Sequence, residues 1–266
     1  MQEVGIKNFV FSSSATVYGE QANAGRPLQE DDLVHFDQTT VMTETLNGNL
    51  TTTATTLVNG ARGLTSPYGR TKYFGEAILA DVAYADPSMR ITALRYFNPV
   101  GCHPSGILRE DPRQTPTNLF PVITRVMNGA QDTLDIYGTD WPTRDGTAVR
   151  DFIHVVDLAK GHLAALIAAS PVVNPYREPF RAYNLGSGTG MTVAEVVESF
   201  EKASHLKIPV VRAPRRDGDV GFCVASTSRA EVELGWKTTR RVDDCAKDAW
   251  NATLFERASG TFNLKR

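Results

Sequence analysis

Short apolar runs of strand length alternate with longer amphipathic stretches along most of this 266-residue chain. In the longer stretches apolar residues recur with the period of a helix. Strands of this length that alternate with helices indicate an α/β protein with a doubly wound parallel sheet. Ligands of such sheets bind outside the carboxyl ends of the strands. The predicted strands are 8–11, 91–96, 134–137, 151–155, 182–185 and 208–211, and the predicted helices are 68–85, 157–169, 193–203 and 242–254.

Residues 33–65 interrupt this alternation. The segment is rich in Thr, Asn and Gly, carries no charged residue from Thr45 to Ala61, and follows neither the helical nor the strand period. A structureless loop of this length is unusual inside a compact domain. We therefore expect an irregular, loosely packed insertion that protrudes from the fold. An error in the predicted coding sequence, such as a retained intron, is the alternative.

Charge and cysteine usage exclude several kinds of partner and site. The formal net charge of −2 gives no basic excess for binding nucleic acid or an anionic membrane. Three widely spaced cysteines fit a reducing compartment better than a disulfide framework or a zinc site. No apolar run reaches the roughly 18 residues of a membrane span, and the first residues lack the regions of a signal peptide. We therefore predict a soluble, cytoplasmic protein without a metal site.

A tyrosine and a lysine follow the insertion at helical spacing. Ser66 can cap a helix whose first residue is Pro67, which places Tyr68 and Lys72 one turn apart on the same face. A phenol has an ordinary pKa of about 10, so a nearby cation helps it to act as a base at neutral pH. Such a pair is common by chance, and an exposed amphipathic pair is the alternative interpretation.

Hydroxyl side chains end the first predicted strand. Ser14 and Thr16 lie at its carboxyl end, which meets the start of the Tyr68 helix at one sheet edge if the two elements are neighbours. A hydroxyl there can orient both a tyrosine oxygen and a sugar hydroxyl. The alternative is a polar strand end in which the serines bond to the backbone.

Five motifs in order resemble those of the UDP-glucose 4-epimerases, a branch of the extended short-chain dehydrogenase/reductase family. The resemblance covers nearly the whole chain apart from the insertion. The motifs are FVFSSSATVYG (9–19), SPYGRTK (66–72), RYFNPVG (95–101), TRDGTAVRDFIH (143–154) and APRRDGD (213–219).

The resemblance implies NAD as cofactor, a UDP-sugar as substrate and a homodimer as the assembly. It implies that Lys72 binds the nicotinamide ribose and stabilises a Tyr68 phenolate. The residues implied in catalysis and NAD binding are Ser14, Tyr68 and Lys72, with Phe97 as a further cofactor contact. Those implied in UDP-sugar binding are Thr16, Asn98, Asn118, Tyr137, Arg150, Arg216, Asp219 and Cys223.

The reaction implied is a transient oxidation. Tyr68 takes the proton of the sugar 4-hydroxyl while NAD accepts the hydride, and the 4-keto sugar turns over and receives the hydride on its other face. Cys223 stands where the family tunes sugar selectivity, and a small residue there leads to the hypothesis that UDP-N-acetylglucosamine is also accepted. An ordinary small core cysteine is the alternative. Without the family, Arg215 and Arg216 are more often a solvated basic pair.

A second glycine-rich stretch, 186–190, does not have dinucleotide-binding spacing. The sequence GSGTG matches neither G-x-G-x-x-G nor G-x-x-G-x-x-G, and no acidic residue ends the next predicted strand. Thr192 and Glu195 instead form a capping box, so a strand-to-helix turn explains these glycines.

The glycine-rich turn that receives the NAD pyrophosphate does not occur in the 266 residues. We therefore expect an N-terminally truncated epimerase that is inactive alone and holds no NAD. The alternatives are a genuine short protein that binds UDP-sugars without catalysis, and another NAD-dependent nucleotide-sugar epimerase or dehydratase. The expected domains are a remnant of an NAD-binding Rossmann domain (1–96) and a mainly UDP-sugar-binding domain (97–266), from which 145–170 returns to the first.

Overall fold

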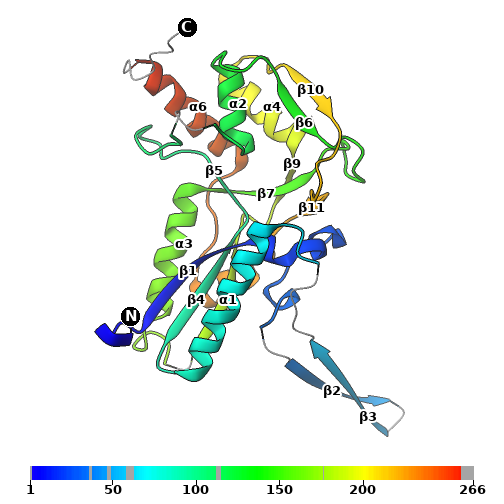
Figure 1. The fold of residues 1–266 in the computed structure, drawn as a ribbon, viewed down its shortest axis with the longest axis vertical. Coiled ribbons are helices and arrows are strands. Elements are labelled where there is room, and N and C mark those ends of the chain that lie inside the picture. The colour runs from blue at the N-terminus through cyan, green and yellow to red at the C-terminus, as the bar shows by residue number, and fades with distance from the viewer. Residues whose placement is uncertain are drawn as a thin grey trace.

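A three-stranded parallel sheet with the strand order β1-β4-β8 forms one half of the molecule (Figure 1). The structure is a computed structural model that describes residues 2–35, 38–46, 49–57, 63–111, 115–175 and 177–258. Ser14 at the end of β1 lies opposite Tyr96 at the end of β4, so the carboxyl ends share one edge. The expected parallel α/β architecture is confirmed. The strands are β1 (Asn8–Ser14), β2 (Gln38–Leu46), β3 (Asn49–Leu57), β4 (Arg90–Tyr96), β5 (Asn98–Val100), β6 (Leu134–Tyr137), β7 (Val149–His154), β8 (Phe180–Leu185), β9 (Gly190–Thr192), β10 (Val210–Ala213) and β11 (Phe222–Cys223).

Helices cover both faces of this sheet. Successive side chains of a strand point to opposite faces, and β4 shows this clearly. Ile91 packs in a cluster with Ala83 of α1, whereas Leu94 packs with Ala165 of α3. The helices are α1 (Pro67–Ala85), α2 (Leu119–Met127), α3 (Val155–Ala168), α4 (Val193–Ser204), α5 (Ser228–Leu234) and α6 (Val242–Ala258), and the 3₁₀ helices are η1 (Gln2–Val4), η2 (Ala15–Ala24) and η3 (Glu30–Asp32).

The other half gathers α2, α4 and α6 around two small groups of strands (Figure 1). One group is the parallel pair β6 and β10, and the other has the order β11-β7-β5 with β9 antiparallel to β7. Three aromatic rings fill the core between the helices and β7. The Phe120 and Phe200 centroids are 4.9 Å apart, and those of Phe120 and Phe152 are 5.7 Å apart. Rings at such distances add to the stabilisation from burial.

The segment 33–65, expected to be irregular, contains an antiparallel hairpin. Strands β2 and β3 pair from Gln38 opposite Leu57 to Leu46 opposite Asn49. The prediction failed because the segment lacks apolar alternation, while its many threonines favour extended backbone through branching at Cβ. The hairpin extends away from the α/β body, as expected of a protruding insertion (Figure 1). Beyond it the chain returns to the body, where the Glu20 amide donates to the Gly63 carbonyl at 2.8 Å.

The two-domain division stays a proposal, with one addition. Strand β8 lies in the first sheet beside β4, so the chain returns to that half at 180–185 as well as through α3.

None of the helices in the described ranges is long and apolar enough to cross a membrane. The same residues contain no group of three or more His, Cys, Asp or Glu side chains arranged to hold a metal ion.

Candidate active site

The end of strand β1 meets the start of helix α1. The Ser66 hydroxyl accepts a hydrogen bond from the Gly69 amide at 3.0 Å, so Ser66 caps the helix and Pro67 is its first residue, as predicted. The two elements approach so closely that a Cβ on Gly69 would lie 2.8 Å from the Thr16 carbonyl oxygen. Only glycine allows this contact without a shift of the backbone.

Tyr68 and Lys72 project from the first turns of α1 toward the end of β1. The Lys72 ammonium donates to the Ser12 carbonyl at 2.8 Å and lies 5.5 Å from the centre of the Tyr68 ring. Tyr68 is 55% exposed, so its phenol is open to a ligand. Buried Ser14 accepts from the Thr16 amide at 3.2 Å and from the Thr16 hydroxyl at 3.0 Å. The structure therefore gathers these four predicted residues at one sheet edge, without a hydrogen bond between Ser14 and Tyr68.

A second tyrosine lies beside this pair and was not predicted. The Tyr96 hydroxyl donates to the Ser12 hydroxyl at 2.8 Å, and it lies 2.5 Å from Nε2 of His162 on helix α3. Burial raises the pKa of the Tyr96 phenol. Its hydrogen bonds thus link β1, whose Ser12 carbonyl accepts from Lys72, to helix α3 on the opposite face of the sheet.

A buried ion pair fixes α1 against the sheet. Glu76, two turns after Tyr68, accepts from Arg95 of β4 through three contacts of 2.7–3.2 Å and from the Ser13 hydroxyl. Both charged side chains are at most 1% exposed. The pKa of Glu76 falls to about 2 because the attraction of Arg95 and several hydrogen bonds outweigh desolvation. Lys72 and Glu76 therefore bond to consecutive residues of β1, Ser12 and Ser13, and hold the helix in one register.

A basic and aromatic group is formed by residues of strands β6, β7 and β11 and of the segment between β10 and β11. The Arg216 guanidinium makes two hydrogen bonds of 3.0 and 3.1 Å to Asp219, and it lies 4.8 Å from the centre of the Tyr137 ring. Arg150 lies opposite Cys223 in the sheet register. Burial lowers the pKa of Arg150 and raises the pKa of Cys223 to about 11. The structure thus brings together five of the residues predicted to bind the UDP-sugar.

Three other predicted residues have contacts of their own. The Phe97 side chain is 7% exposed and packs in a core cluster, so only its backbone is open to a cofactor contact. The Asn98 side chain donates to the Asp151 carbonyl at 3.0 Å. Asn118 occupies the N-cap position of α2 and borders a separate cavity.

The glycine-rich turn 186–190 is held by a buried carboxylate, which agrees with its interpretation as a structural turn. Asp151 accepts from the Ser187 amide and hydroxyl, from the Gly188 amide and from the Ala225 amide at 2.6–3.1 Å. A Cβ on Gly186 would lie 2.5 Å from Asp151 Oδ2. The predicted capping box of the following helix is also present.

Sequence reasoning missed the buried polar residues that support the site. The sequence pattern assigns no role to the side chains of Glu76, Arg95 and Asp151, because burial is not visible in composition. One signal was available, since Glu76 follows Tyr68 and Lys72 at the same four-residue interval and so shares their helical face.

Comparisons with known proteins agree with this geometry. Residues 1–186 match the model of the NAD dependent epimerase/dehydratase family. UDP-glucose 4-epimerase 3 of Oryza sativa subsp. japonica is 45% identical over 253 residues, which are 94% of this chain and 58% of the relative. UDP-glucose 4-epimerase of Erwinia amylovora is 44% identical over 94% of this chain and 64% of its own length.

A solved structure shows the same fold. UDP-glucose 4-epimerase from Bifidobacterium longum in complex with NAD+ and UDP is 42% identical, with a TM-score of 0.76 over 97% of this chain and 66% of that structure. The chain thus spans less than two thirds of the length of the relatives it matches, and the match includes the strand and helix that carry Ser14 and Tyr68. The chain belongs to the NAD dependent epimerase/dehydratase family.

Proposed function

We propose that this chain carries the UDP-sugar site and the catalytic tyrosine of a UDP-glucose 4-epimerase, which interconverts UDP-glucose and UDP-galactose. The observation that carries the proposal is the placement of Tyr68 and Lys72 at the sheet edge formed by Ser14 and Thr16, in a chain that also brings Arg216, Asp219 and Tyr137 together. The relatives named above support the substrate.

Each side chain has a role that follows from its chemistry. The exposed Tyr68 phenol takes the proton of the sugar 4-hydroxyl, and the Lys72 ammonium stabilises the phenolate by its charge. Ser14 orients the sugar hydroxyl by a hydrogen bond. Arginine forks suit a diphosphate, so Arg150 and Arg216 hold the pyrophosphate, while the Asp219 carboxylate accepts hydrogen bonds from the ribose.

The residues present fit only one end of NAD. Tyr68 and Lys72 can bond to the nicotinamide ribose, whereas the sequence has no glycine-rich turn for the pyrophosphate. Bound NAD would supply the reversible hydride acceptor that the reaction needs. We therefore propose that the 266-residue chain alone keeps the sugar site, retains no NAD and catalyses no turnover. A purified sample that releases stoichiometric NAD on denaturation would contradict this.

Calorimetric titration with UDP tests the nucleotide site without any cofactor. One UDP should bind per chain, and Arg216→Gln should weaken binding about tenfold, because a charge-assisted hydrogen bond contributes about 1.5–3 kcal/mol. Arg212→Gln is the matched control, since Arg212 is an exposed arginine on the neighbouring strand β10. Absence of UDP binding, or equal losses in the two variants, would refute the proposed site.

The acceptance of N-acetylated sugars is a finer proposal. Cys223 leaves more room than a tyrosine, so UDP-N-acetylglucosamine and UDP-glucose should bind with similar affinity. Cys223→Tyr should weaken binding of the acetylated sugar selectively. A wild-type chain that binds UDP-glucose alone would exclude this.

The proposal also covers the oligomeric state and the cellular location of the protein. We propose a homodimer, which light scattering with size exclusion would detect as twice the chain mass. All three cysteines are free thiols, which supports a reducing, cytoplasmic location. Localisation of the tagged chain in cells tests this.

A further inference from the structure

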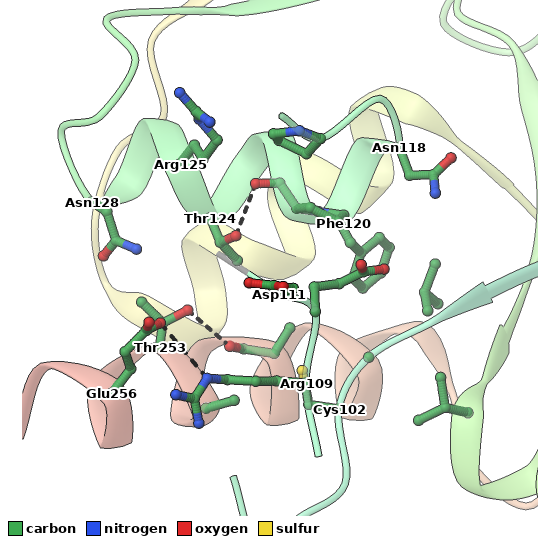
Figure 2. Close-up of a pocket in the computed structure, with 18 of the residues that line it drawn as sticks. Cys102, Arg109, Asp111, Asn118, Phe120, Thr124, Arg125, Asn128, Thr253 and Glu256 are labelled. Atoms are coloured by element: carbon green, nitrogen blue, oxygen red, sulfur yellow. Dashed lines mark hydrogen bonds and ion pairs between the residues drawn. The ribbon is translucent and has the colours of Figure 1, made fainter. Parts of the chain in front are cut away.

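A cavity of about 230 Å³ lies between helices α2 and α6 and the loop that follows strand β5 (Figure 2). Among the residues proposed to hold the UDP-sugar or NAD, only Asn118 borders it. The cavity therefore has its own walls and is distinct from the edge that carries Tyr68 and from the group around Arg216.

The walls are apolar on one part and hydrogen-bonding on another. Phe120 and Ala252 contribute carbon surface, whereas Thr124 and Thr253 contribute hydroxyls. Each hydroxyl donates to a carbonyl of its own helix, Thr124 to Pro121 at 2.9 Å and Thr253 to Ala249 at 3.1 Å. Their oxygen lone pairs stay available to accept a hydrogen bond from an occupant.

Three buried polar atoms of the lining residues have no hydrogen-bond partner within the part of the chain that the structure describes. They are Nε of Arg109, Nε of Arg125 and Oδ1 of Asn128. Arg109 Nε comes within 3.8 Å of Glu256 Oε2, which makes an ion pair but lies beyond hydrogen-bonding distance. A buried group without a partner costs about 1–3 kcal/mol. Two donors and one acceptor at one cavity thus point to an occupant that both accepts and donates.

The charge of the lining argues against an anion. Among the lining residues that the structure describes, two cationic side chains, Arg109 and Arg125, face three carboxylates, Glu110, Asp111 and Glu256. A phosphate or a second nucleotide would therefore meet net negative charge. A neutral occupant avoids this repulsion.

We propose that this cavity binds a neutral polyhydroxylated molecule of monosaccharide size. Each hydroxyl of a sugar accepts and donates, which matches the arginine N–H groups, the Asn128 carbonyl and the threonine oxygens. Its C–H faces match the apolar wall. The volume holds about eight waters at roughly 30 Å³ each, so sugar hydroxyls would replace a small water cluster. This site lies outside the proposed nucleotide-sugar site and needs no NAD.

Saturation-transfer NMR and calorimetry with D-galactose and D-glucose test the site on the 266-residue chain. We expect saturable binding in the millimolar range that UDP does not displace. Asn128→Leu and Thr253→Val should each weaken it at least fivefold while the melting temperature changes little. Asn251→Leu is the matched control, because Asn251 is exposed on α6 and does not line the cavity.

Four results would overturn the inference: no saturable binding up to about 100 mM sugar, equal losses in Asn128→Leu and Asn251→Leu, inorganic phosphate bound in place of sugar, or displacement of the sugar by UDP. The last result would place the sugar in the nucleotide-sugar site and leave the proposed function intact. Loss of UDP binding with retained sugar binding would refute the proposed function alone.

Discussion

Replacement of Glu76 by glutamine should strongly destabilise the fold, because it removes the charge that balances buried Arg95. The side chains are 0% and 1% exposed, so solvent cannot take over the lost interaction. Breaking one partner of a buried ion pair costs about 3–5 kcal/mol. The pKa gives a similar magnitude, since a fall from 4.5 to about 2 corresponds to about 3 kcal/mol at about 1.4 kcal/mol per pKa unit.

Urea titration followed by far-UV circular dichroism measures this loss. For a chain of this size, about 3 kcal/mol lowers the melting temperature by on the order of 10 °C. Glu198→Gln is the matched control, since it removes the same charge from an exposed position on α4 and should cost less than about 0.5 kcal/mol.

The pH dependence gives an independent check. Because the pKa of Glu76 is depressed in the fold, its contribution is complete above about 4.5 and is lost as the pH falls toward 2. The difference between wild type and Glu76→Gln should therefore shrink over that window. A loss below about 1 kcal/mol at pH 7 would show that the carboxylate does not hold Arg95 in place, and our account of helix α1 would be wrong.

Three further perturbations have defined outcomes. Gly186→Ala places a Cβ 2.5 Å from Asp151 Oδ2 and should cost about 1–3 kcal/mol in urea titrations, whereas an unchanged midpoint would show that the turn yields freely. Burial lowers the pKa of His154 despite its contact with Asp248. As the pH falls, the unfolded chain therefore takes up a proton at this position more readily than the folded chain does. Stability should fall from pH 7.5 to 5.5, and His154→Gln should flatten this dependence. Replacement of 38–57 by a short Gly-Ser linker should change the unfolding free energy by less than about 1 kcal/mol, because closure cost grows slowly with loop length; aggregation or a lost transition would contradict this.

Regular periodicity made much of the fold predictable from the sequence. The strand at 134–137 and the start of the helix at 193 match the structure, and Ser66 caps α1 as expected. Short elements such as β9 and β11 escaped prediction because two or three residues show no period. Helix α2 was missed inside a proline-rich stretch, although its apolar face packs through Phe120 and Ile123.

The candidate site was predictable to the extent that its chemistry is local. The interval between Tyr68 and Lys72 follows from one helix, and their neighbour Ser14 follows from the rule on sheet edges. Contacts between distant segments did not follow, such as that between Glu76 and Arg95 or between Tyr96 and His162. They depend on which side chains the tertiary fold buries, and a polar residue carries no mark of that in a single sequence.

Hydrogen bonds to the α/β body hold the chain on both sides of the β2–β3 hairpin. His35 lies against Glu76 on the way out, and Gly63 accepts from the Glu20 amide on the way back. Because both contacts lie outside β2 and β3, we expect that these strands can be shortened or replaced without moving Ser14 or Tyr68. The same position is suitable as an insertion site, where a fluorescent domain, an affinity tag or a reporter peptide could replace the hairpin.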